Sequence, residues 1–438
     1  MHRLTLIYPA IGHKPGKPSV RSWQMQPLSI ARLAAMTPPN WQTTFMDDRV
    51  EPVNENVETD LVGISIETYT AKRGYQIAAR FRARGIPVVL GGYHATLCPE
   101  EAVQHADAIC VGEAEGVWEN ILADAAAGHL KPRYQNKTSL PLENIRPDRS
   151  IFDGKKYLPI ALVESSRGCP FQCHFCSIGG AYQGSFRQRS IPEIVEELRT
   201  LKERVVFFVD DNIVGNPSTA RELFRAIAPL GIRWISQGSL NALRDESLLQ
   251  EMARSGCIGL LVGFESLDAR NLEAMGKRIN HVEEYSGVLH AMRRAGMLVY
   301  GTFMFGYPHD TETSFEATVK FARKQGLLLG AFNHLVPFPG TPLYRDLAEQ
   351  NRFPKPEWWL DENFSFGQVP FNPTSLSAKQ IEAGCLRARR SFYSWPSMIQ
   401  RFLTMRPPAR MVGTYWLLNL MLRREISQKA GIPLGIRE

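Results

Sequence analysis

Between residues 157 and 342, six segments rich in Val, Ile, Leu and Phe alternate with amphipathic segments. The apolar segments lie at 158–166, 204–212, 233–240, 258–266, 297–308 and 329–339. Apolar runs of this length, separated by helix-like segments, are typical of parallel strands that are covered on both faces. Six consecutive units predict an incomplete (β/α)6 TIM barrel, whose ligands bind at the carboxyl ends of its strands.

The first 140 residues show the same alternation and predict a separate α/β domain. Its pattern favours a doubly wound, Rossmann-like (flavodoxin-like) sheet, which also binds ligands at the carboxyl ends of its strands. The dinucleotide fingerprint G-x-G-x-x-G does not follow the first strand, so a dinucleotide is not predicted. Polar residues at 141–156 predict a linker, residues 157–342 the barrel, and residues 343–438 a helical extension.

The positive charge of the chain is confined to its last segment. The net charge is +7, and residues 379–438 contain 11 Lys or Arg and three Glu, so the rest is about neutral. This distribution argues against a nucleic-acid partner. The basic segment also carries Trp, Met and Leu, which fits peripheral contact with a membrane surface. The favoured interpretation is a helical cap on the barrel mouth with its arginines in solvent.

Seven cysteines and the absence of a secretory leader at the start of this sequence predict a reducing, cytoplasmic environment rather than a disulfide framework. No run of about 18 apolar residues predicts a membrane span. Four of the cysteines are scattered in apolar or helical contexts and are interpreted as buried small apolar residues. They are Cys98, Cys110, Cys257 and Cys385.

The other three cysteines lie in "SSRGCPFQCHFCSIGG", where Cys169, Cys173 and Cys176 have the spacing C-x3-C-x2-C. A structural zinc site needs four ligands, usually as two separated pairs, and no second pair follows. His174 lies inside the loop, where its neighbours would crowd a tetrahedral site. Three thiolates can instead hold three irons of a 4Fe-4S cluster and leave the fourth open to a small molecule. A chance group of structural thiols is the alternative.

This spacing after the first barrel strand, with the aromatic Phe175 before the last cysteine, resembles the radical S-adenosylmethionine (SAM) enzymes. The resemblance implies that the amino and carboxylate groups of SAM chelate the open iron. It also implies that an electron from the reduced cluster cleaves SAM to methionine and a 5'-deoxyadenosyl radical. An electron donor such as a flavodoxin or ferredoxin is then an expected partner.

Residues at later strand ends fall where this family places its SAM contacts. Each of them also fits a strand-end turn or a helix cap, Asp211 most clearly. The implied SAM contacts are Phe175, Asp210, Asp211, Gln237, Ser239, Glu265, Met304 and Gly306. By position alone, the candidates for lining a substrate cavity are Tyr300, Tyr307, His309, Asp310 and His334.

The N-terminal domain, with "QPLSIARLAAM", "GGYHAT" and "VGEAE", resembles the cobalamin-binding domain found before such barrels. The D-x-H-x-x-G motif is absent, as is usual in this subclass, which implies base-off cobalamin without a protein histidine. His94 fits a local hydrogen-bonding role better than a corrin contact. A domain that has lost its ligand is the alternative. The implied cobalamin contacts are Ser65, Thr68, Gly91, Gly92, Tyr93, His94, Thr96 and Glu113.

The combined pattern is similar to class B radical SAM methyltransferases. It predicts a cobalamin-dependent enzyme that methylates an unactivated carbon or a phosphinate phosphorus of a small molecule. Radical cyclisation, ring contraction or another rearrangement without methyl transfer is the alternative within the class. An iron-sulfur sensor or scaffold without turnover is the alternative from another class, and release of 5'-deoxyadenosine discriminates between them.

Overall fold

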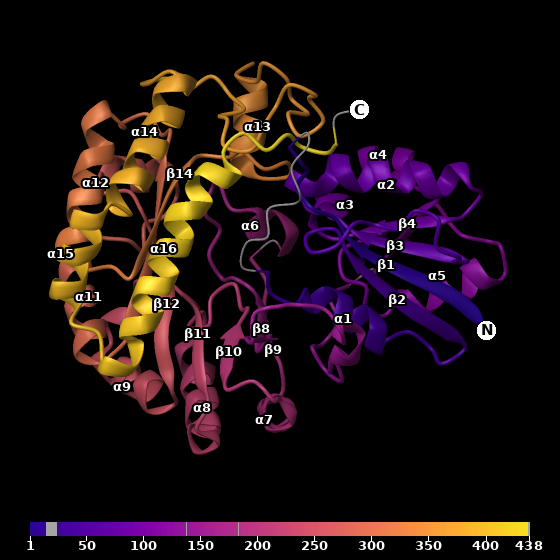
Figure 1. The fold of residues 1–438 in the computed structure, drawn as a ribbon, viewed down its shortest axis with the longest axis horizontal. Helices are drawn as coiled ribbons and strands as arrows, with labels where there is room; N and C mark the ends of the chain where they lie inside the picture. The colour runs from indigo at the N-terminus through magenta and orange to yellow at the C-terminus, as the bar shows by residue number, and fades with distance from the viewer. Residues whose placement is uncertain (15–23, 137, 183, 437–438) are drawn as a thin grey trace.

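The computed structural model describes residues 1–14, 24–136, 138–182 and 184–436, and it contains two six-stranded parallel sheets (Figure 1). The first sheet has the order β2-β1-β3-β4-β5-β6 and the second the order β14-β13-β12-β11-β10-β7. An antiparallel pair, β8-β9, follows the first strand of the second sheet. The predicted α/β class with parallel sheets is therefore confirmed.

The first sheet is covered on both faces. In β1, Leu6 packs into one apolar cluster and Ile7 into another, because successive side chains point to opposite faces. Its strands are β1 (His2–Tyr8), β2 (Trp41–Asp47), β3 (Leu61–Ser65), β4 (Val88–Gly91), β5 (Ala108–Val111) and β6 (Arg133–Gln135). Its helices are α1 (Leu28–Ala35), α2 (Ala71–Ala83), α3 (Tyr93–Leu97), α4 (Pro99–Ala102) and α5 (Trp118–Ala126).

The second sheet has one face packed under helices and one inner face that is partly open. In β13, Val299, Phe303 and Phe305 are buried, while Tyr300 and Met304 on the opposite face are half-buried. Its strands are β7 (Ala161–Val163), β10 (Val205–Phe208), β11 (Arg233–Gly238), β12 (Cys257–Glu265), β13 (Leu298–Phe305) and β14 (Leu329–His334), and the separate antiparallel pair is β8 (Ser166–Gly168) and β9 (Phe186–Gln188). The helices are α6 (Ser177–Tyr182), α7 (Ile191–Thr200), α8 (Pro217–Ile227), α9 (Glu246–Arg254), α10 (Ala269–Ala274), α11 (Tyr285–Arg294), α12 (Glu312–Lys324) and α13 (Pro342–Glu349).

The chain ends in α14 (Ala378–Phe392), α15 (Trp395–Met405) and α16 (Val412–Lys429), which pack at the β14 edge of the second sheet (Figure 1). The prediction of solvent-exposed arginines is wrong for Arg401, which is fully buried. Its guanidinium donates to the carbonyls of Leu327, Leu328 and Phe392 and to Oδ1 of Asn419. These acceptors replace water, so a buried arginine joins α15 to α16 and to the start of β14. Short 3-10 helices occur at Thr68–Thr70, Val103–His105, Arg149–Phe152, Ala228–Leu230, Ala242–Arg244, Val282–Glu284 and Ala409–Met411.

The C-terminal extension also packs against the N-terminal domain. Trp358 and Trp359 are buried in a cluster that belongs mainly to the first sheet. Leu434 lies in the same cluster, and the backbone of Gly435 pairs with that of Gly12. The last part of the chain therefore packs on both sheets.

Candidate functional site

The three clustered cysteines lie on the loop between β8 and α6. All three are free thiols and half-buried. The loop is fixed by backbone bonds: the amide of His174 donates to the carbonyl of Met275, and the amide of Leu343 donates to the carbonyl of His174. Segments far apart in the sequence thus hold this loop at the carboxyl end of the second sheet.

The sulfur atoms lie near one another in a desolvated place. Burial raises the pKa of all three thiols, that of Cys173 to about 11. The charges of Cys176 and Cys169 raise the pKa of Cys173 further, whereas nearby Lys277 lowers it. Thiols with raised pKa values are protonated near pH 7, so metal binding here must release protons.

The geometry of the loop fits a cluster better than a single ion. His174 Nε2 lies 2.7 Å from Oδ2 of Asp346 in α13 and is thereby engaged outside the thiol group. Across the part of the chain that the structure describes, no three His, Cys, Asp or Glu side chains are arranged to hold one metal ion. In a 4Fe-4S cluster each thiolate binds a different iron, and the three thiols present match that requirement.

Lys277 and Glu265 form an ion pair beside the loop. Burial lowers the pKa of Lys277, but Glu265 and the charges of Cys173 and Cys176 raise it above its ordinary value. Glu265 has a φ of 62°, in the left-handed region that is strained for a non-glycine residue. The pair brings a buried cation next to the thiols, where it favours their deprotonated form.

The implied SAM contacts separate into two groups. Asp210 is fully buried and accepts hydrogen bonds from the amides and hydroxyls of Ser165 and Ser166, so it fixes the backbone before the cysteine loop. Gly306 is also buried, and its amide donates to Asp310. Both residues therefore have structural roles, and their implied SAM contacts stay predictions.

The remaining implied SAM contacts stay available. Asp211 accepts from the amide of Gly168 at 2.9 Å, and burial raises the pKa of Asp211 to about 6. The amide of Ser239 donates to the side chain of Asn212, and Gln237 is half-buried on β11. Phe175, Glu265 and Met304 also lie on the loop or at the carboxyl ends of strands.

The residues predicted to line a substrate cavity are dispersed. Tyr300 is half-buried on the inner face, and the Tyr307 hydroxyl is buried, without a hydrogen-bond partner, near Cys173 and Glu265. His309 is exposed, which does not support the prediction that it lines a cavity. His334 is buried at the end of β14, and burial lowers its pKa to about 4.

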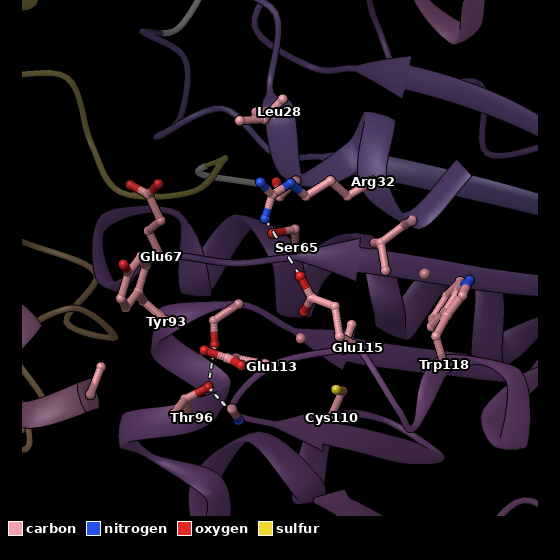
Figure 2. Close-up of a pocket in the computed structure, with 18 of the residues that line it drawn as sticks. Leu28, Arg32, Ser65, Glu67, Tyr93, Thr96, Cys110, Glu113, Glu115 and Trp118 are labelled. Carbon is pink, nitrogen blue, oxygen red and sulfur yellow. Dashed lines mark hydrogen bonds and ion pairs between the residues drawn. The ribbon is translucent and has the colours of Figure 1, made fainter. Parts of the chain in front are cut away.

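A cavity of about 350 Å³ lies between the carboxyl edge of the first sheet and the start of the second domain. Figure 2 shows Ser65, Tyr93, Thr96 and Glu113 around it, with Arg32 and Glu115 facing each other. Ala181 and Tyr182 of α6 complete the wall. Arg167 on the wall is two residues before Cys169, and α6 starts directly after Cys176, so residues of the wall flank the cysteine loop on both sides.

Six of the eight residues implied as cobalamin contacts line this cavity: Ser65, Gly91, Gly92, Tyr93, Thr96 and Glu113. Thr68 and His94 do not. His94 is fully buried, with Nδ1 at 3.2 Å from Oγ1 of Thr68 and Nε2 at 3.0 Å from Oε1 of Glu101. Both ring nitrogens are occupied in the interior, so the predicted corrin contact of His94 is corrected to a packing role.

The residues lining the cavity fit a large, mostly uncharged ligand. Glycines end or follow adjacent strands, and a Cβ at Gly112 would point into open space. Hydroxyls of Tyr8, Ser65, Tyr93 and Thr96 also line the cavity; that of Tyr8 donates to Glu67 and that of Thr96 to the carbonyl of Gly92, and such groups can also bond neutral amides such as those around a corrin ring. The described lining contains no histidine, which agrees with a ligand bound without one.

Sequence reasoning missed an ion-pair network on the cavity wall. Arg167 bonds Glu115 at 2.9 Å and Glu164 at 3.1 Å, and pairs with Glu113 at 3.2 Å. Arg32 pairs with Glu164 at 2.6 Å. Glu113 and Glu115 follow β5 of the first sheet, whereas Glu164 and Arg167 follow β7 of the second, so the network joins the two domains. The pairing of such distant segments leaves no signal in the local sequence.

Known proteins resemble both the sequence and the fold. Residues 163–322 match the family model of the radical SAM superfamily. The bacteriochlorophyllide d C-12(1)-methyltransferase of Chlorobaculum tepidum is 29% identical over 411 residues, which cover 91% of this chain and 88% of that protein.

Two solved structures have a similar fold. One is TsrM from Kitasatospora setae, a radical SAM methyltransferase that was solved with cobalamin and a [4Fe-4S] cluster. Its TM-score is 0.65 at 16% identity, and the match covers 89% of this chain and 81% of the TsrM chain. The cobalamin-dependent SAM radical enzyme OxsB was solved with aqua-cobalamin and SAM. It has a TM-score of 0.68 at 13% identity, and the match covers 97% of this chain and 72% of the OxsB chain.

Proposed function

We propose that this chain, whose residues 163–322 match the family model of the radical SAM superfamily, is a cobalamin-dependent enzyme that methylates a small molecule. The observation that carries the proposal is a single cavity walled by both domains and adjoining the cysteine loop. A radical enzyme needs its cofactors close together and sheltered from water, and this arrangement supplies both conditions.

The cysteine loop would hold the cluster through Cys169, Cys173 and Cys176. When bound, the cluster and SAM supply a 5'-deoxyadenosyl radical, and cobalamin supplies the methyl group. Asp211 and Gln237 lie at strand ends near the loop and would orient SAM by hydrogen bonds. Lys277 keeps a positive charge beside the thiolates and offsets part of their repulsion.

Cobalamin would bind against the carboxyl edge of the first sheet, as is general for ligands of doubly wound domains. Ser65, Tyr93 and Thr96 would bond its amide groups, and Gly91 and Gly92 let the backbone approach closely. Arg32 and Arg167 would keep the surrounding carboxylates paired.

The proposed methyl acceptor is an unactivated carbon, or a phosphinate phosphorus, of a small molecule bound on the inner face near Tyr300 and Met304. The Chlorobaculum relative is named for a bacteriochlorophyllide d substrate, so this tetrapyrrole belongs in the first substrate panel. A flavodoxin or ferredoxin would supply the reducing electrons.

The test uses the full chain produced anaerobically with hydroxocobalamin, reduced, and supplied with SAM that carries a deuterated methyl group. We expect about four irons and one cobalt per chain, release of 5'-deoxyadenosine, and a labelled methyl group in an accepted substrate. Deoxyadenosine without methyl transfer would favour a radical rearrangement. An intact cluster without deoxyadenosine would favour a sensor or scaffold.

Matched variants separate the two cofactor sites. Cys173→Ser should lose the cluster, whereas Cys98→Ser, outside the loop, should retain it. Ser65→Trp would fill the cavity and should lower cobalt while iron stays, and Gln104→Trp on an exposed position should change neither. Retention of cobalt in Ser65→Trp would contradict the proposed cobalamin site.

A further inference from the structure

Large apolar side chains are exposed on two neighbouring helices of the C-terminal extension. On α15, Trp395 and Ile399 are each 50% exposed and Leu403 is 65% exposed; on α16, Leu417 is 57% and Leu420 is 40% exposed. The only other large apolar side chain exposed to this degree in the described chain is Met1. The exposure is therefore concentrated rather than scattered, which is the pattern of an interaction surface.

The two sets of side chains form one surface. Trp395, Ile399 and Leu403 are spaced four residues apart and share a face of α15, and Leu417 and Leu420 share a face of α16. Trp416 of α16 contacts Phe402 and Trp395 of α15, with ring centroids at 5.6 and 6.3 Å. The helices run side by side in Figure 1, joined by the turn at Ala409–Met411. We call this the α15-α16 surface.

Exposed arginines lie beside both stripes. Arg424 follows Leu420 by four residues and so shares its face of α16, whereas Arg406 directly follows α15 as its left-handed C-cap; both arginines are exposed. Because the helices are antiparallel, the two arginines lie at opposite ends of the α15-α16 surface. Arg423 lies over the Trp395 ring at 5.8 Å.

Acidic groups do not balance these arginines. Residues 383–424 contain eight Arg, of which Arg401 is fully buried, and no Asp or Glu. The flanking acids are engaged elsewhere: Glu382 accepts from the amide of Val369, and Glu425 is buried and paired with Lys429. The α15-α16 surface is thus apolar in its middle, with the exposed Arg406, Arg423 and Arg424 at its margins.

We propose that the α15-α16 surface binds peripherally to anionic lipid bilayers. Apolar side chains with Trp, surrounded by Arg, suit the boundary between lipid head groups and acyl chains, and each basic residue adds attraction to anionic lipid. A second copy of the chain fits less well, because a two-fold contact would bring Arg against Arg. None of the described helices is long and apolar enough to cross a membrane. This inference does not depend on the proposed function.

The experiment is vesicle flotation with the full chain and two kinds of vesicle: phosphatidylcholine alone, and phosphatidylcholine with phosphatidylglycerol. The chain should float with the anionic vesicles at low salt and remain free with the neutral ones. Leu403→Gln with Leu417→Gln should lower the partition coefficient by tenfold or more, and so should Arg406→Gln with Arg424→Gln. Both pairs are exposed, so the fold should tolerate the changes.

The matched control is Lys202→Gln with Arg254→Gln, which removes the same charge at exposed positions outside the surface and should leave flotation within about twofold. Three results would overturn the proposal: no flotation of the unaltered chain, equal flotation with both vesicles, or flotation that the surface variants do not change. Self-association in the absence of lipid that the surface variants abolish would assign the surface to a second copy instead.

Discussion

At the scale of single residues, His94 is the clearest case in which a predicted cofactor contact has a packing role in the structure. Its ring lies between Thr68 and Glu101 and does not face the cavity. His94→Ala should leave the cobalt content and visible spectrum of cobalamin-loaded protein unchanged. It should lower the free energy of unfolding by about 1–3 kcal/mol, because Glu101 loses a buried partner. Denaturant titration and the spectrum check both parts, and a changed spectrum at unchanged stability would contradict the packing role.

His334 provides a pH-dependent prediction. Burial lowers its pKa to about 4 from an ordinary value of 6.5. The unfolded state therefore binds a proton on this histidine between pH 6.5 and 4 while the folded state does not, so stability falls as the pH decreases through that window. The full difference in the free energy of unfolding that arises from this histidine is about 3 kcal/mol.

The measurement for His334 is the free energy of unfolding of the unaltered chain and of His334→Gln at several pH values between 7 and 5. The variant should lose less stability than the unaltered chain as the pH falls. Identical pH dependence in the two proteins would show that His334 does not titrate as described.

The cysteine loop and the strand-end part of the cavity lining were accessible from sequence, because each is a local pattern. C-x3-C-x2-C identified the three thiols, and strand-end positions identified Ser65, Tyr93 and Thr96. Residues such as Tyr182 and Arg32 were missed because their place on the cavity wall depends on how distant segments pack. The predicted SAM contact of Asp210 stays a prediction, because an acidic strand end looks the same in sequence whether it contacts a ligand or caps a backbone turn.

At the scale of elements, the C-terminal extension joins both domains through Trp359. Its ring is 2% exposed, and its Nε1 donates to Glu101 at 3.1 Å. Trp359→Ala should lower the free energy of unfolding by about 3–5 kcal/mol, because it leaves a cavity and removes a partner of Glu101. Urea titration measures the change. The matched control Trp395→Ala, at a half-exposed ring, should cost less than about 2 kcal/mol, and equal costs would contradict the account.

Strands were predicted correctly where their apolar pattern was strong, and the short strand at the edge of the first sheet was missed. The six strands of the second sheet follow the predicted apolar segments, since each is buried on at least one face. The strand β6 lies inside the predicted N-terminal domain but is not marked by apolar residues, because only Tyr134 of its three residues is buried and its neighbours are exposed. An edge strand of this kind carries too little apolar pattern to be recognised. The predicted domain boundaries at 140, 156 and 342 stay predictions.

At the scale of the whole molecule, a buried network of charges holds the two domains around one cavity. Arg167 is 6% exposed and contacts glutamates from both domains. Burial lowers the pKa of Arg167, but Glu164 and Glu115 outweigh it and raise the pKa above its ordinary value. The guanidinium therefore stays charged, and its planar set of donors can serve three carboxylates at once.

Arg167→Ala should destabilise the protein by about 3–5 kcal/mol, because it leaves Glu113, Glu115 and Glu164 near one another in a desolvated place without that cation. Cobalt content after loading should fall as well, since these carboxylates line the cavity, whereas the cysteine loop should still bind iron. Arg167→Lys should have an intermediate effect, because an ammonium cannot bond three carboxylates in one plane.

The control Arg146→Ala removes an exposed partner of Glu196 and should lower the free energy of unfolding by less than about 1 kcal/mol. If both alanine variants cost the same, the network does not hold the domains together; if only Arg167→Ala loses stability and cobalt, the two sheets and their shared cavity form one unit.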